Sequence, residues 1–186
     1  MPDSLQGEVV VLRPLRAADA AAYARAFRED EGMGRLLGVE RDPTEAEVTG
    51  RVESAAERAR TGRGAALVVC TQEDDSLLGE VMLHTFAWKH RRCEIGFWIA
   101  PSARGRGLAR DGIARTLRWA FEDLAIERME MATTPENAPT RGIATRLGFV
   151  QEGVQRKRNL ERGARVDMVL FGLLARDWAD ERAGAA

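Results

Sequence analysis

The residues best suited to bind a charged ligand form a glycine-rich turn, which comprises Arg104, Gly105, Arg106, Gly107, Leu108 and Ala109. A turn of this kind before a helix leaves several backbone N–H groups without partners, and the helix dipole adds positive potential there. Glycine lets a ligand approach the backbone closely, and arginine adds charge-assisted hydrogen bonds. The turn is therefore predicted to bind a phosphate or pyrophosphate group.

A strand before the turn and a helix after it must position these residues. Residues 94–100 read Glu-Ile-Gly-Phe-Trp-Ile-Ala and are followed by Pro101. Beyond the turn, apolar side chains recur at helical spacing, at Ile113, Leu117, Ala120, Phe121 and Leu124. Two common phosphate motifs do not fit, because the chain has no G-x-x-x-x-G-K-[ST] and Arg110 replaces the third glycine of a dinucleotide fingerprint.

A second segment begins with Asn137 and Thr140 and ends in Gly148-Phe149. Apolar residues between them predict a short helix with a glycine cap that leads into a strand. In this order and spacing the two segments resemble the GCN5-related N-acetyltransferase (GNAT) superfamily, which pairs an [RQ]-x-x-G-x-[GA] turn with a later N-x-x-[ST] helix ending in G-F. Residues 11–15, 152–154 and 167–178 are similar to its RimJ/RimL branch.

The resemblance implies an α/β (α+β) fold with a mixed, mostly antiparallel twisted sheet of about seven strands, splayed in the middle and flanked by about four helices. We expect residues 1–186 to form this single N-acetyltransferase domain, with a frayed tail at 179–186. Acetyl-CoA or coenzyme A is the implied co-substrate, and the splayed strand offers N–H groups to the thioester carbonyl. The implied coenzyme-binding residues are Phe97, Trp98, Ile99, Arg104, Gly105, Arg106, Gly107, Leu108, Ala109 and Asn137.

Transfer of an acyl group to an amine needs a base for the amine proton, a donor for the carbonyl oxygen and stabilisation of the leaving thiolate. The resemblance implies Glu94 as the base, with His84 and Glu80 on the preceding strand as open alternatives. Many superfamily members place a tyrosine near the leaving group, but Tyr23 is the only tyrosine here. Thr140 either assists the thiolate in its place or is simply a polar residue of the first helical turn.

The expected acceptor is a primary amine, on a small molecule or at a peptide or protein N-terminus, which attacks directly in a ternary complex. Succinyl-CoA or another acyl-CoA donor remains an alternative, because arginines near the pocket can pair with an extra carboxylate. A second class of function is a non-catalytic module that binds an acyl-CoA, RNA or an acidic partner through basic residues at 156–165. No aromatic residues are interleaved to stack bases, so nucleic acid is not the expected partner.

Composition agrees with one domain of balanced charge, since 28 Lys and Arg face 29 Asp and Glu in 186 residues. No apolar run reaches the ~20 residues of a membrane span, and the N-terminus lacks a signal-peptide pattern. We therefore expect a cytoplasmic protein without a membrane partner. Cys70 and Cys93 have apolar neighbours and no metal-ligand spacing, which predicts buried thiols and no metal. A homodimer, common in the RimJ/RimL branch, is possible.

Periodicity and capping residues predict the remaining elements. Asp19 caps a helix through Phe27, Thr44 and Glu47 form a capping box for a helix to about Arg60, and residues 32–41 form a loop. The other helices are expected at 107–124 and from Asn137 to the glycine cap. Strands are expected at 9–12, 65–71, 77–88, 92–100, 128–134, 149–157 and 165–174.

Overall fold

One sheet runs through the protein in the order β1-β2-β3-β4-β5-β6-β8-β7. A computed structural model describes residues 1–30, 33–34, 41–161 and 163–178. Neighbouring strands are antiparallel except for β5 and β6, which are parallel. The strands are β1 (Leu5–Gln6), β2 (Val10–Pro14), β3 (Ala65–Thr71), β4 (Leu77–Ala87), β5 (Arg92–Ile99), β6 (Arg128–Thr133), β7 (Val150–Glu161) and β8 (Ala164–Leu174).

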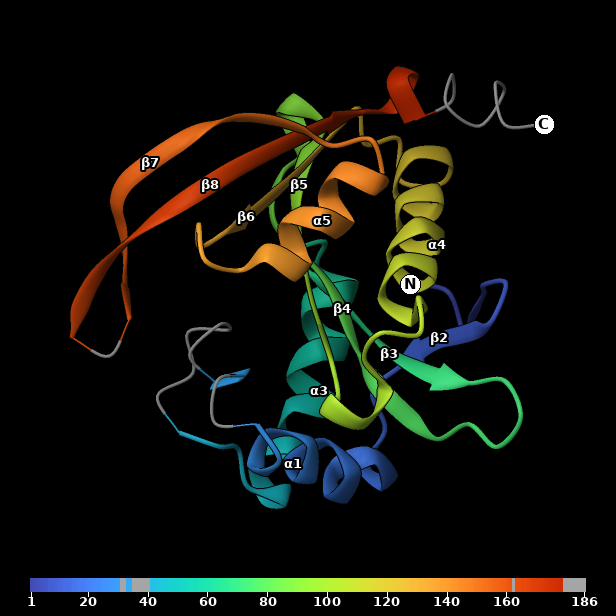
Figure 1. Ribbon diagram of the computed structural model, residues 1–186. Helices are drawn as coiled ribbons and strands as arrows, with labels where there is room; N and C mark the ends of the chain where they lie inside the picture. Colours follow the sequence, from blue (N-terminus) through green and yellow to red (C-terminus); the bar gives the residue numbers. More distant parts are fainter. Residues whose placement is uncertain (31–32, 35–40, 162, 179–186) are drawn as a thin grey trace.

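Helices cover both faces of this sheet, which confirms the expected mixed fold (Figure 1). The described helices are α1 (Ala20–Arg28), α3 (Glu45–Arg60), α4 (Leu108–Glu122) and α5 (Ala138–Arg146). Apolar side chains of β5, β6, α4 and α5 share one buried cluster, to which Ile95, Met131 and Ile113 belong. A second cluster lies under α1 and α3 and includes Phe27 and Trp98. The sheet therefore separates two cores.

The sheet is split at its centre, between β5 and β6. These strands pair only at Arg92–Arg128, Cys93–Met129 and Glu94–Glu130. Beyond Glu94, β5 stays paired with β4 as far as Ile99, but its other edge has no strand partner in the described chain. The splayed strand expected from the sequence is thus present, and it starts directly after Glu94.

Side-chain hydrogen bonds fix the start of α3 and the position of α4. The expected capping box of α3 is confirmed, because Thr44 accepts from the Glu47 amide and Glu47 accepts from the Thr44 amide. In the first turn of α4, Asp111 accepts the N–H groups of Glu8, Val9 and Val10 at 3.0, 2.8 and 3.0 Å. These bonds tie α4 to the chain entering β2.

The prediction that the Asp19 side chain caps α1 is wrong. Asp19 makes no side-chain cap on α1, and its carboxylate instead accepts the Arg16 amide at 2.7 Å and both terminal nitrogens of buried Arg13 at 2.9 Å. A buried guanidinium must be paired, so it takes the carboxylate that the helix would otherwise use.

The β7–β8 hairpin is longer than expected and extends away from the body of the protein (Figure 1). The sequence placed the end of its first strand at 157, whereas β7 continues to Glu161. Nearly every residue of β7 is exposed on both faces, so hydrophobic alternation did not mark this end.

The burial of the two thiols was also predicted from the sequence. Cys70 and Cys93 are buried as expected, and no described helix is long and apolar enough to cross a membrane. Most of the loop expected at 32–41 and the tail expected at 179–186 lie outside the described residues.

Candidate active site

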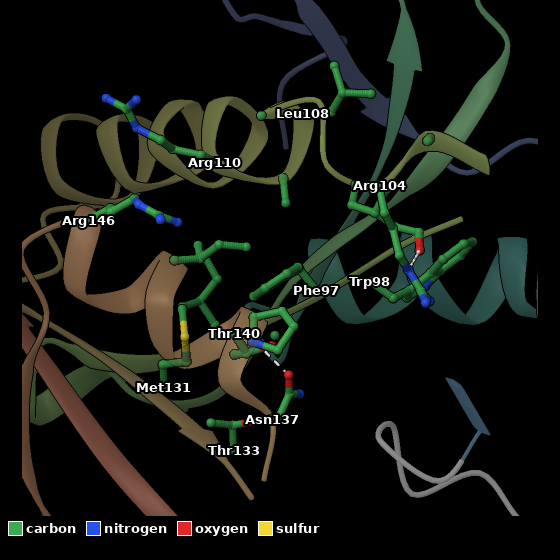
Figure 2. A pocket seen from close by; sticks show the side chains of 18 of the residues that line it. Phe97, Trp98, Arg104, Leu108, Arg110, Met131, Thr133, Asn137, Thr140 and Arg146 are labelled. Atoms are coloured by element: carbon green, nitrogen blue, oxygen red, sulfur yellow. Dashed lines mark hydrogen bonds between the residues drawn. The ribbon is translucent and has the colours of Figure 1, made fainter. Parts of the chain in front are cut away.

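A cavity of about 700 Å³ opens where β5 and β6 separate, between these strands and helices α4 and α5 (Figure 2). Its lining comprises Met33, Ile95, Gly96, Phe97, Trp98, Ile99, Ala103, Arg104, Gly105, Gly107, Leu108, Ala109, Arg110, Met131, Ala132, Thr133, Asn137, Pro139, Thr140, Ile143 and Arg146. The walls are mostly apolar, and polar groups concentrate at the glycine turn and at the start of α5. This combination suits a long ligand with an apolar arm and a charged end.

The glycine turn presents a run of unbonded N–H groups to this cavity. Within the described chain, no backbone hydrogen bond is donated by residues 105–110, and the first such bond beyond the turn runs from the Asp111 amide to the Gly107 carbonyl. Gly105 and Gly107 have φ of +74° and +77°, and nothing lies within 4 Å of the position a Cβ would occupy on either. Left-handed backbone favours glycine here, and the open space lets an anion reach the N–H groups.

The two arginines of the turn differ in position. Arg104 lines the cavity, but its Nε donates to the Ile99 carbonyl at 3.0 Å and its Nη1 lies 2.6 Å from Asp30. These bonds brace the turn against β5 and the end of α1. Arg106 is exposed and is not part of the cavity lining.

The three β5 residues expected to contact a coenzyme all line the cavity, but their side chains do not all face the same side of the sheet. Phe97 and Ile99 belong with the core on the α4 side of the sheet. Trp98 faces the other way, where it packs edge-on against Tyr23 and Phe27 at centroid distances of 4.8 and 5.3 Å. Its contribution to the cavity is therefore its backbone, as the splayed-strand expectation requires.

Asn137 and Thr140 lie together at the N-terminus of α5, on the cavity wall (Figure 2). The Asn137 Oδ1 accepts the Thr140 amide at 3.2 Å, so one half of the Asn137 amide group caps the helix. Its NH₂ group and the Thr140 hydroxyl make no hydrogen bond within the described residues. Both remain able to meet a ligand.

Glu94 lies on the opposite face of the sheet and lines a second cavity, of about 240 Å³. The wall of this cavity comprises Arg92, Glu94, Arg128, Glu130, Met131, Ala132, Glu152, Gln155, Arg158, Leu170 and Phe171. Met131 and Ala132 line both cavities, so the two spaces lie on either side of β6 at the split in the sheet, one residue beyond the Glu94–Glu130 pair.

Ion pairs fix most of the charges around this second cavity. Glu130 lies 2.7 Å from Arg92 and 2.9 Å from Arg128, and both terminal nitrogens of Arg128 donate to Glu152. Arg128 lowers the pKa of the Glu152 carboxyl through these bonds. Gly172 leaves room for the pair, because a Cβ there would lie 2.5 Å from Glu152 Oε1.

The two alternative bases lie elsewhere. Glu80 is fully buried, and its Oε2 accepts from the Tyr23 hydroxyl at 2.7 Å and from the Trp98 indole at 3.2 Å. Burial, followed by the Glu80 charge, raises the pKa of Tyr23. His84 is the cross-strand neighbour of Glu94, but neither His84 nor Glu80 lines either cavity. Of the three candidates, Glu94 has access to a ligand.

Sequence reasoning missed the β6 wall, the α5 residues Ile143 and Arg146, and Arg110 one residue past the glycine turn. The signal available in the sequence was the strand–helix–strand order of β5, α4 and β6. A crossover unit of this kind places its two strands side by side, as the parallel pairing of β5 with β6 shows. Sequence reasoning also missed Arg158, which it counted in a basic surface cluster and which lines the cavity of Glu94.

Comparison with known proteins identifies this architecture. The model of the acetyltransferase (GNAT) domain family matches residues 10–150. YoaA of Bacillus subtilis, an uncharacterized N-acetyltransferase, is 25% identical over 91% of this chain and 96% of its own length. YdaF of Bacillus subtilis, provisionally described as a ribosomal N-acetyltransferase, is 33% identical over 59% of this chain, and that match spans only 60% of YdaF.

Among solved structures, RimJ of Mycobacterium smegmatis in complex with CoA-disulfide superposes with a TM-score of 0.88. It is 26% identical, and the match covers 99% of this chain and 95% of RimJ. The family model, which spans well over half of the chain, and this shared fold agree with the glycine turn and split sheet described above. The chain belongs to the GNAT family of acetyltransferases.

Proposed function

We propose that the protein transfers an acetyl group from acetyl-CoA to a primary amine by direct attack in a ternary complex. The supporting observation is that two cavities flank the split between β5 and β6 and share Met131 and Ala132 in their walls. The larger carries the phosphate-type N–H cradle, and the smaller carries Glu94. Two substrates entering from opposite faces of the sheet would meet beside Met131 and Ala132.

The cavity on the α4 side would hold the coenzyme. Its pyrophosphate would accept N–H groups of the turn at 105–110, and the pantetheine arm would lie along the unpaired edge of β5. The Asn137 NH₂ group would donate to an amide oxygen of that arm. RimJ of Mycobacterium smegmatis, solved with CoA-disulfide, supports this ligand class for the shared fold.

Backbone N–H groups on the free edge of β5, within residues 95–99, would stabilise the charge that develops on the thioester oxygen. Glu94 would take the proton of the ammonium group, directly or through one water, so that the nitrogen lone pair attacks the carbonyl carbon. As the C–N bond forms, the C–S bond breaks and the thiolate leaves. The second proton of the attacking nitrogen then passes to the thiolate, directly or through water, which gives the amide and the free thiol of CoA. The Thr140 hydroxyl would donate to that sulfur, a contact that strengthens as charge moves onto it.

An assay of CoA thiol release tests this proposal. Purified protein is given acetyl-CoA with a panel of amines that includes amino acids, amino-acid amides, polyamines and short peptides, and products are weighed by mass spectrometry. N-acetylated product formed in equal amount to free CoA is the expected result. Succinyl-CoA in parallel identifies the donor, and an absence of transfer to every amine, with CoA still bound, would leave only a binding module.

A further inference from the structure

The cavity beside Glu94 carries more charge than acyl transfer itself requires. Six charged side chains line it, namely Arg92, Glu94, Arg128, Glu130, Glu152 and Arg158. The proposed reaction uses one carboxylate as a base. The other charges must either neutralise one another or recognise something on the acceptor.

Four of the six neutralise one another. Arg92 and Arg128 flank Glu130 at 2.7 and 2.9 Å, and Arg128 also binds Glu152 through both terminal nitrogens. Within the residues that the structure describes, the Glu94 carboxylate and the Arg158 guanidinium make no ion pair or hydrogen bond. One uncommitted anion and one uncommitted cation therefore face the same small cavity.

The size of the cavity limits what can join these two groups. A round space of 240 Å³ is about 8 Å across. In an α-amino acid the nitrogen lies about 3 Å from the carboxylate oxygens, and two charge-assisted hydrogen bonds of about 2.8 Å extend this span to 8–9 Å. The volume also equals that of roughly eight water molecules, which accommodates an amino acid.

We propose, on the basis of the proposed function, that the acceptor is a small zwitterion of the α-amino acid type. Its ammonium group lies against Glu94, at the split where the thioester arrives, and its carboxylate pairs with Arg158 of β7. Arg158 is then a specificity-determining residue that holds the amine in reach of the thioester carbon. A guanidinium suits this role because its planar donors match a carboxylate in two parallel hydrogen bonds.

The same pair of charges disfavours other amines. A polyamine brings a second cation to the neighbourhood of Arg158, and like charges repel. A long peptide N-terminus offers an amine without an adjacent carboxylate, so Arg158 would stay unpaired. The Gln155 side chain, which also lines the cavity, can serve either amino-acid substituents or water.

Matched acceptors isolate the carboxylate. Initial rates are measured with acetyl-CoA and a set of free amino acids, each beside its α-amide, which keeps the amine and side chain and removes the charge. Arg158→Gln removes the guanidinium, and Arg156→Gln is the control, since Arg156 is an exposed neighbour on β7 that does not line the cavity. Thermal unfolding confirms that both variants are folded.

We expect kcat/KM for the preferred amino acid to fall by about 10- to 100-fold in Arg158→Gln, with values for its amide within about twofold of the parent protein. In each variant, kcat/KM for the free amino acid is divided by kcat/KM for its amide. Comparing this ratio between variants removes the effect of amine basicity. Arg156→Gln should leave both values unchanged. The proposal is overturned if amides and acids lose activity equally, or if peptides or polyamines are acetylated and free amino acids are not. Transfer to none of the amines would instead count against the proposed acetyl transfer itself.

Discussion

Replacing Gly107 by aspartate should weaken coenzyme binding through charge. Gly107 precedes α4 with φ of +77°, lines the larger cavity and has open space where a Cβ would lie. A carboxylate about 5 Å from a phosphate charge is unfavourable by about 1 kcal/mol in water and by about 3 kcal/mol at an effective dielectric of 20. These two energies correspond to a loss of CoA affinity of roughly fourfold and of a few hundredfold. For Gly107→Asp we expect a loss of at least about tenfold.

Gly107→Asn separates this charge from shape. Asparagine and aspartate have nearly the same size, and both tolerate left-handed backbone better than other non-glycine residues. Each should lower the stability of the protein by about 1 kcal/mol, or about 2–4 °C in Tm. Gly163→Asp, at φ of +80° with equally open surroundings in the β7–β8 turn and outside both cavities, controls for the strain.

Titration calorimetry with CoA at two salt concentrations provides the measurement. Gly107→Asp should bind CoA at least about fivefold more weakly than Gly107→Asn, and added salt should narrow that gap because it screens exposed charges. Gly163→Asp should bind like the parent protein. Equal affinity of folded Gly107→Asp and the parent protein would refute the assignment of the turn to the pyrophosphate.

Four further predictions follow from the site and the packing around it. Glu94→Gln should lower kcat by about 10²-fold with little change in KM for acetyl-CoA, and steady-state kinetics with turnover like the parent protein would remove Glu94 as the base. Thr140→Val should lower kcat while Thr140→Ser keeps it, whereas a KM defect alone would leave Thr140 only a role in coenzyme binding. Gly79→Ala should lower Tm by about 2–10 °C, because its Cβ would lie 2.2 Å from the Trp98 carbonyl oxygen and push β5; an unchanged melting curve contradicts this packing. Burial raises the thiol pKa of Cys70 and Cys93 to about 12, so in native protein at pH 8 neither should react with iodoacetamide until it unfolds, and rapid labelling detected by mass spectrometry would contradict their burial.

Much of the fold and part of the lining of the larger cavity could be predicted from local patterns. β3 matches its expected bounds, 65–71, because apolar residues between turn signals mark a buried strand. The capping box at Thr44 and Glu47 likewise fixed the start of α3. A splay or bulge in the strand at residues 94–100 was expected from family resemblance, and the structure shows a split that begins after Glu94.

The cavity of Glu94 could not be predicted in this way, because its wall comes from distant segments of the chain. Glu94, Arg128 and Glu152 belong to three strands, and nothing in their local sequence shows that ion pairs use some charges and leave others uncommitted. Arg158 illustrates the difficulty, since it belongs to a basic run typical of a solvated surface. β8 pairs with both β6 and β7, and this pairing brings Arg158 to the cavity of Glu94.

A crystal structure of the protein with CoA would test the central claim most directly, namely that two substrates meet at the split between β5 and β6. We predict pyrophosphate oxygens within hydrogen-bond distance of N–H groups in residues 105–110, and the pantetheine arm along β5 between Phe97 and Asn137. The sulfur should lie near Thr140 and beside Met131, facing the cavity that contains Glu94. CoA bound elsewhere, or with its sulfur turned away from this junction, would contradict the account.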